Sequence, residues 1–121
     1  MSARVKRVLA VDDDPYILEA IKIILETNGY QATTIRNGSK TLKLAQDLQP
    51  DLILLDILLM GQDGRDICRR LKALPKTSQI PVILVSAITV GASNFHSCGA
   101  VDYIEKPFDL HHLLTRIAVF V

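Results

Sequence analysis

Short apolar runs alternate with helical patterns along the whole chain. Runs typical of strands cover residues 5–11, 31–35, 51–56, 80–86 and 101–104. After each run, apolar residues recur every three or four positions, which indicates amphipathic helices. The pattern therefore predicts a strand followed by a helix, repeated five times. Parallel strands need such helical crossovers, and because these are right-handed, helices should cover both faces of the sheet.

The predicted fold is a doubly wound α/β domain with a five-stranded parallel sheet. The simplest strand order is 2-1-3-4-5, as in flavodoxin-like folds. The third run reads DLILLD, and its continuous apolar centre indicates burial on both faces. We expect the 121 residues to form one domain, either complete or cut from a longer protein.

Polar residues mark the expected ends of the helices. Asp14 precedes Pro15 as an N-cap, and Asn28-Gly29 ends the same helix. Asp109 is expected to cap the last helix. The segment 87–98 should form only a short or distorted helix. Four of its residues are poor helix formers, namely Gly91, Ser93, Asn94 and Ser97.

Composition narrows the class of protein. Apolar residues make up 49% and charged residues 22%, and a net charge of +1 gives no basic footprint for nucleic acid. We found no signal-peptide pattern and no apolar run near the ~20 residues of a membrane span, so we expect a cytoplasmic location without membrane attachment. Cys68 and Cys98 are interpreted as reduced packing residues, with a disulfide or redox role left open.

Candidate chemistry gathers at the carboxyl ends of the predicted strands, where doubly wound sheets bind ligands. Asp12–Asp14 follow the first strand and Asp56 ends the third. Ser86 ends the fourth strand, and Lys106 follows the fifth. Because the first and third strands are neighbours in the predicted order, their acidic ends should converge.

Converging carboxylates repel one another unless a cation lies among them. Hard oxygen ligands suit Mg2+, which takes one or two carboxylates, and Asp12 and Asp13 are the natural metal pair. Asp56 can touch the metal and attack phosphorus, while Lys106 and Ser86 could neutralise and position a phosphoryl group. Each residue alone has a structural reading, such as helix capping for the acidic run. Their joint position at strand ends favours a site.

Four stretches of the sequence resemble the receiver domain of two-component response regulators, over essentially the whole chain. They read VLAVDDDP, PDLILLDILL with the following DG, PVILVSA and GAVDYIEKPF. The resemblance implies a phosphoacceptor domain rather than an enzyme. Asp56 would take the phosphoryl group from a phosphohistidine on a histidine kinase or phosphotransfer protein. Mg2+ would lie on Asp12, Asp13, Asp56 and the backbone carbonyl of Leu58.

The resemblance also implies a switch. Ser86 would bond a phosphoryl oxygen after moving inward, and Lys106 would pair with phosphorylated Asp56. Tyr103 stands at the aromatic switch position of the family. Phosphorylation adds a dianionic group with three acceptor oxygens, and this local charge change would bias a two-state element. The fourth helix, fifth strand and fifth helix would report the change and are a candidate homodimer interface, whereas the output domain or target stays open.

Several positions depart from the family pattern. Met60 stands where the family usually has proline. Leu58 and Ile88 are apolar at two positions where polar residues often guide attacking water, so we predict slow self-dephosphorylation. The spacing from Ser86 to Gly99 is shorter than usual, which again points to an altered fourth helix.

Two other functions were weighed. Asp12-x-Asp14 resembles the nucleophile pair of haloacid-dehalogenase-type phosphatases, but that family expects Thr or Val where this chain has Tyr16, and Asp56 would be unexplained. A binding module that has lost phosphorylation is disfavoured by the intact set of acidic, hydroxyl and ammonium side chains. The three histidines are not spaced like a metal set.

Overall fold

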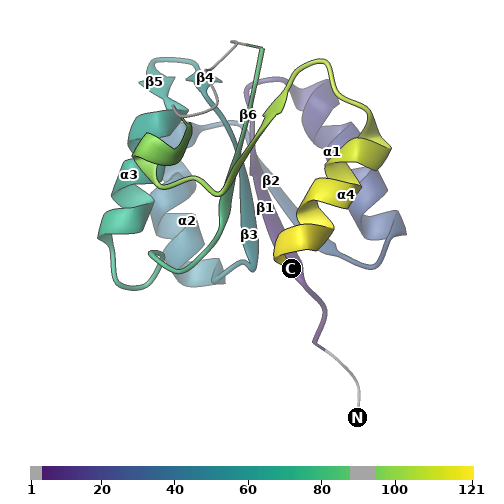
Figure 1. Ribbon diagram of the computed structural model, residues 1–121, viewed down its shortest axis with the longest axis horizontal. Helices are drawn as coiled ribbons and strands as arrows, with labels where there is room; N and C mark the ends of the chain where they lie inside the picture. The colour runs from purple at the N-terminus through teal and green to yellow at the C-terminus, as the bar shows by residue number, and fades with distance from the viewer. Residues whose placement is uncertain (1–3, 88–94) are drawn as a thin grey trace.

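The computed structural model describes residues 4–87 and 95–121 as one parallel sheet between two layers of helices (Figure 1). The sheet has the order β2-β1-β3-β6-β7, with every neighbouring pair parallel. This is the predicted order 2-1-3-4-5, and it confirms the doubly wound fold. The strands are β1 (Arg7–Val11), β2 (Gln31–Ile35), β3 (Leu52–Asp56), β6 (Val82–Ser86) and β7 (Asp102–Glu105).

Two helices cover each face of the sheet (Figure 1). One face carries α1 (Pro15–Thr27) and α4 (Leu110–Phe120), and the other carries α2 (Thr41–Leu48) and α3 (Gly64–Ala73). The short 3-10 helices η1 (Gly38–Lys40) and η2 (Phe95–Cys98) lie on the α2 and α3 side. None of the helices in the described ranges has the length and apolar character needed to cross a membrane.

Each face of the sheet has its own hydrophobic core. Along β3, Ile53 and Leu55 point into the core under α2 and α3, while Leu52 and Leu54 point into the core under α1 and α4. All five residues of β3 are buried, as the apolar run predicts. Burial on both faces holds this strand in the centre of the sheet, and its carboxyl end is held with it.

The predicted helix boundaries are largely confirmed. The Asp14 carboxylate accepts a hydrogen bond from the Tyr16 amide at 2.9 Å, and Asp109 accepts one from the His111 amide at 2.7 Å. These bonds satisfy amides that a helix leaves free in its first turn. Gly29, with φ of +88°, takes the left-handed conformation that ends α1.

One region differs from the expectation, and another agrees with it as far as it is described. The loop after β3 contains a small antiparallel hairpin, β4 (Leu58–Leu59) and β5 (Gln62–Asp63), which the sequence did not predict. In the segment expected to form a short or distorted helix, residues 95–98 form the 3-10 helix η2. Residues 88–94 of that segment, which include Ile88, lie outside the described residues.

Candidate functional site

The carboxyl ends of the strands bring four of the predicted residues to the same edge of the sheet. Val11 pairs with Leu55 in the sheet, so Asp12 and Asp56 leave neighbouring strands at the same level. Ser86 pairs with Glu105, which places Lys106 just beyond β6 and β7. Asp12, Asp56 and Ser86 are buried, with exposures of 3%, 4% and 0%. The sheet register therefore builds one buried polar cluster from residues that are distant in sequence.

Lys106 bridges the two buried carboxylates. Its Nζ donates to Asp12 Oδ2 at 2.8 Å and to Asp56 Oδ2 at 3.0 Å. Its side chain is only 16% exposed, and those of its partners are 5% and 6% exposed. The ammonium supplies the positive charge that two converging acids need. The sequence predicts a role for this lysine toward a phosphoryl group but does not predict its bond to Asp12.

Backbone amides hold the remaining carboxylate oxygens. The Asp14 amide donates to Asp12 Oδ1 at 2.9 Å, and the Leu58 amide donates to Asp56 Oδ1 at 3.2 Å. Both acids are therefore oriented by the loop that follows their own strand. The Asp14 carboxylate caps α1. Asp14, the second acid of the phosphatase-like pair, therefore faces the end of a helix.

Burial and charge set the pKa values of the cluster. Burial raises the pKa of Asp56, and the nearby Asp12 carboxylate adds to the rise, while the hydrogen bond from Lys106 opposes it. Burial by itself would lower the pKa of Lys106, but its hydrogen bonds to Asp12 and Asp56 outweigh this and raise the pKa. The lysine is therefore a fixed positive charge beside a carboxylate that burial makes more basic.

Gly64 brings the start of α3 against the end of β3. A Cβ at this position would overlap the Asp56 carbonyl oxygen. The Gly64 amide also donates to the Ile57 carbonyl at 2.8 Å. Only glycine permits this approach, so Gly64 helps to position Asp56. In the sequence, Gly64 stands out only as part of a stretch that matches the family, and no role is predicted for it.

Ser86 is linked to Tyr103 and to Lys106. The Ser86 carbonyl accepts a hydrogen bond from the Lys106 amide at 2.8 Å and another from the Tyr103 hydroxyl at 3.4 Å. Tyr103 is half-buried and packs against the core under α2 and α3. The predicted switch residues are thus in contact at the end of β6.

Asp13 and Leu58 lie at the rim of the cluster. Asp13 is half-buried, and its carbonyl accepts a hydrogen bond from Arg36 Nε at 3.1 Å. With Arg36 and Met60 it lines a hollow of about 350 Å3. The side chain of Leu58 points outward, with the residue 53% exposed. Arg36 is a neighbour of the site that the sequence argument missed.

The donor set fits a magnesium ion through two carboxylates rather than three. In residues 4–87 and 95–121, no three His, Cys, Asp or Glu side chains form a group that could hold a metal. Mg2+ needs only one or two carboxylates, because it keeps several of its waters. Asp12, Asp56 and Lys106 carry a net charge of −1 when ionised, so the cluster can still accept positive charge.

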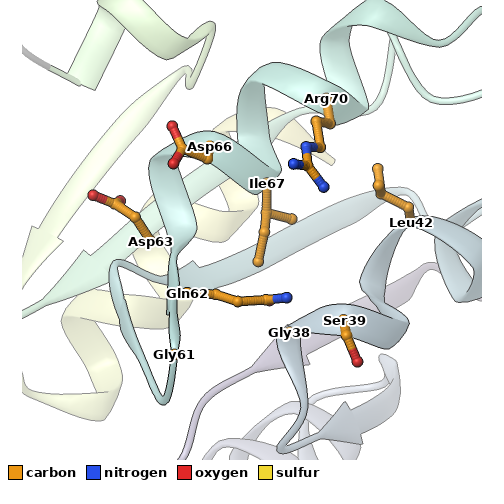
Figure 2. Close-up of a pocket in the computed structure, with 9 residues that line it drawn as sticks. All are labelled: Gly38, Ser39, Leu42, Gly61, Gln62, Asp63, Asp66, Ile67 and Arg70. Carbon is orange, nitrogen blue, oxygen red and sulfur yellow. The ribbon is translucent and has the colours of Figure 1, made fainter.

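Two larger hollows lie elsewhere on the surface, and one of them reaches the cluster at Lys106. One of about 390 Å3 lies between η1 and the start of α3, where Gln62 reaches over Gly38 and Arg70 reaches in from α3 (Figure 2). It holds none of the predicted site residues. The other is an apolar groove of about 400 Å3 beside Lys106. Its walls come from α1 and from the segment after β7, and they include Ile17, Ala20, Ile21, Pro107, Phe108 and Leu110.

Comparisons with known proteins agree on one family. The family model for the response regulator receiver domain matches residues 8–118. The DNA-binding dual master transcriptional regulator RpaA of Synechocystis sp. is 42% identical over 92% of this chain and 47% of its own length. The DNA-binding response regulator MtrA of Mycolicibacterium smegmatis is 39% identical over 93% of this chain and 49% of its own length. The chain thus spans about half the length of these curated relatives.

One of the similar solved structures contains a metal ion. The receiver domain of the sensor histidine kinase PA1611 from Pseudomonas aeruginosa is 26% identical, with a TM-score of 0.86. The match covers 97% of this chain and 98% of that one. That protein has a magnesium ion coordinated in its active site cleft.

Proposed function

The chain belongs to the response regulator receiver domain family, and from this premise we propose that Asp56 is the residue that accepts its phosphoryl group. A receiver domain is a phosphoacceptor signalling module of a two-component phosphorelay. The observation that carries the proposal is the buried cluster in which Lys106 bridges Asp56 and Asp12. It combines a nucleophilic carboxylate with a fixed positive charge.

Phosphoryl transfer to Asp56 forms one bond and breaks another. A carboxylate oxygen of Asp56 attacks the phosphorus of a phosphohistidine, a new O–P bond forms, and the P–N bond breaks as the imidazole leaves. The transferred group carries its charge on its terminal oxygens, so catalysis is mainly positioning and neutralisation. The Lys106 ammonium is already within hydrogen-bond distance of Asp56 and can neutralise the negative charge of the transferred group.

The buried carboxylates of Asp12 and Asp56 would hold Mg2+, and Asp13 and the Leu58 carbonyl would complete the site from its rim. The ion, when bound, neutralises charge on the phosphoryl oxygens. What supports this set is the buried Asp12 and Asp56 pair, with Asp13 at its rim. Lys106 and the metal would then share the two carboxylates.

We assign the switch to Ser86 and Tyr103. Phosphorylation would draw the Ser86 hydroxyl and the Lys106 ammonium toward new acceptor oxygens. A shift of Ser86 would alter its contact with Tyr103, which now bonds the Ser86 carbonyl. The change would be reported on the face formed by η2, β7 and α4. The same face is our candidate for a homodimer interface.

The proposed partner is a histidine kinase or phosphotransfer protein. The apolar groove beside Lys106 gives such a partner a place to contact the chain close to Asp56. Output would come from another domain or a target protein, without direct binding of nucleic acid by these residues. We place the domain in the cytoplasm, where the free Cys68 and Cys98 would stay reduced.

The proposal is tested with a small phosphodonor such as acetyl phosphate, with and without Mg2+. We expect intact mass spectrometry to find one added phosphoryl group on the parent, and none on Asp56→Ala or without Mg2+. Asp47→Ala is the matched control, because Asp47 is an exposed aspartate whose one ion pair among the described residues is with Lys43. No uptake by the parent, or equal uptake by Asp56→Ala, would refute the assignment.

The same experiment measures the lifetime of the phosphoryl group once donor and Mg2+ are removed. We expect it to last well beyond seconds, because the side chain of Leu58 cannot orient an attacking water. Leu58→Asn places an amide there and should shorten the lifetime. A parent that loses the group within seconds would contradict this expectation.

A further inference from the structure

Two thiols outside the phosphorylation site meet where η2 packs on α3. Cys68 lies on α3 and Cys98 is the last residue of η2, and both are free and buried, with exposures of 0% and 3%. The Cys68 thiol donates to the Cys98 carbonyl at 3.3 Å, which brings the thiol of one cysteine against the backbone of the other. They are the two cysteines of the chain. The fold has therefore brought both cysteines of this sequence close together.

The packing around the pair is tight. Gly99 follows Cys98 with φ of +93°, and a Cβ there would lie 2.7 Å from Lys72 Cγ. The backbone after η2 thus rests directly on the stem of Lys72, one turn beyond Cys68 on α3. The Cys98 thiol also donates to the Phe95 carbonyl at 3.2 Å. These contacts hold the two cysteines in a fixed relation to each other.

The surroundings slow the reaction of these thiols but do not prevent it. Burial raises the pKa of Cys68 to about 12, and Cys98 adds to the rise, while the positive charge of Lys72 acts in the opposite direction. Thiolate is the reactive form, so exchange at neutral pH should be slow. Whether a disulfide forms at equilibrium depends instead on how well the folded chain holds the two sulfurs together.

We infer that Cys68 and Cys98 are a redox pair that closes into an intramolecular disulfide in the presence of a small disulfide oxidant such as oxidised glutathione. One thiolate attacks a sulfur of the oxidant and releases one reduced glutathione. The second thiolate attacks the mixed disulfide and releases the other. The two thiol protons pass to the two released glutathione thiolates, so two cysteine thiols and one oxidised glutathione become one protein disulfide and two reduced glutathiones. In the cytoplasm such bonds are typically transient and redox-sensing.

Closure of this bond would tie η2 to α3. η2 leads through Gly99 into β7, the strand that carries Tyr103 and precedes Lys106. An oxidising signal would therefore act on the segment before β7, independently of any phosphoryl group. The inference does not depend on the role proposed for Asp56.

The test compares the folded chain with the same chain unfolded in urea. Both are equilibrated in glutathione buffers of graded redox ratio, quenched with acid and analysed by mass spectrometry for loss of two hydrogens. We expect the equilibrium constant for closure to be at least about tenfold larger in the folded chain, because folding holds the thiols side by side. An equal or smaller constant in the folded chain, or mixed disulfides alone, would overturn the inference.

A second measurement uses the melting temperature. A disulfide that fits the folded state stabilises it, so the oxidised parent should melt above the reduced parent. The double variant Cys68→Ser with Cys98→Ser controls for other effects of the oxidant and should melt at one temperature in both buffers. An oxidised parent that melts at or below the reduced parent would also overturn the inference.

Discussion

Gly64 sets how closely the start of α3 approaches Asp56. Replacing it with alanine would put a methyl group into the Asp56 carbonyl and 3.0 Å from the Ile57 Cα. Backbone cannot move aside as a flexible side chain can, so the end of β3 must shift. We expect Gly64→Ala to lower the free energy of unfolding by about 1–3 kcal/mol. We also expect the substitution to slow phosphorylation of Asp56. Urea titration measures the loss of stability, and the kinetics of phosphorylation by a small phosphodonor measure the loss of rate.

Gly29→Ala is the matched control for this substitution. Gly29 has φ of +88° but nothing within 4 Å of an added Cβ. Alanine there meets only backbone strain of about 1–2 kcal/mol. Both variants should lose stability, but only Gly64→Ala should lose phosphorylation rate. Equal rates in the two variants would show that the approach of α3 does not position Asp56.

At the scale of elements, α3 begins with an ion pair that also caps it. The Asp63 carboxylate accepts from the Arg65 amide at 2.8 Å and pairs with the Arg65 guanidinium at 2.7 Å. The hydrogen bond from Arg65 is the main reason that the pKa of Asp63 is lowered below 3.8, against the effect of burial. The ionised form therefore stabilises the folded chain.

We predict that Asp63→Asn removes a pH-dependent part of the stability. Because the folded pKa is lowered, the contribution is complete above the unfolded value of 3.8 and is lost as the pH falls through the folded value. Both side chains are about one-third exposed, so solvent screening limits it to below about 1 kcal/mol. Asparagine keeps the helix cap.

Urea titrations of both proteins across acid and neutral pH check this prediction. The difference between parent and variant should be present at pH 7 and shrink below pH 3.8. Asp109→Asn, at the cap of α4, is the matched control without an arginine partner among the described residues. A difference for Asp63→Asn that does not change with pH would contradict the prediction.

Local rules predicted most of the elements, because their causes lie within a few residues. The caps Asp14 and Asp109 and the turn at Gly29 are local signals, and each falls where it was expected. The β4–β5 hairpin was not predicted, because a strand of two residues is too short to show an alternation of apolar and polar residues. The last strand lies one residue later than predicted, because its pairing with β6, and not its own composition, sets its ends.

The sequence predicts which residues meet at the candidate site, but it does not predict the hydrogen bonds among them. The carboxyl ends of parallel strands meet at one edge, so Asp12 and Asp56 could be placed together from strand order alone. Which carboxylates Lys106 bonds depends on side-chain geometry, and the spacing of residues along the sequence does not reveal it. The same holds for the contact of Gly64 with Asp56 and for that of Cys68 with Cys98.

At the scale of the whole molecule, the site links the edge of the sheet to its centre. Lys106 follows the edge strand β7 and reaches past the end of β6 to Asp56 on β3 and Asp12 after β1. One ammonium thus neutralises two acids from different strands. A divalent cation on the same two acids would compete with it, so the stability of the fold and the affinity for Mg2+ should be coupled.

We predict that Lys106→Met is destabilised and regains more from Mg2+ than the parent does. Without the ammonium, two buried carboxylates remain unpaired, which costs about 3–5 kcal/mol. Mg2+ binds only the folded chain and stabilises it by RT ln(1 + [Mg2+]/Kd). Because Lys106 no longer competes for Asp12 and Asp56, the Kd should fall, and the gain in melting temperature on replacing EDTA with MgCl2 should rise.

Lys76→Met is the control, since Lys76 is an exposed lysine whose ammonium makes no ion pair within the described ranges. Its melting temperature in EDTA and its gain from MgCl2 should match those of the parent. Asp12→Asn should gain least, because it removes one of the two buried carboxylates. If Lys106→Met gained no more from Mg2+ than the parent, the metal and the ammonium would not share these carboxylates, and Mg2+ would have to bind by way of the rim residue Asp13.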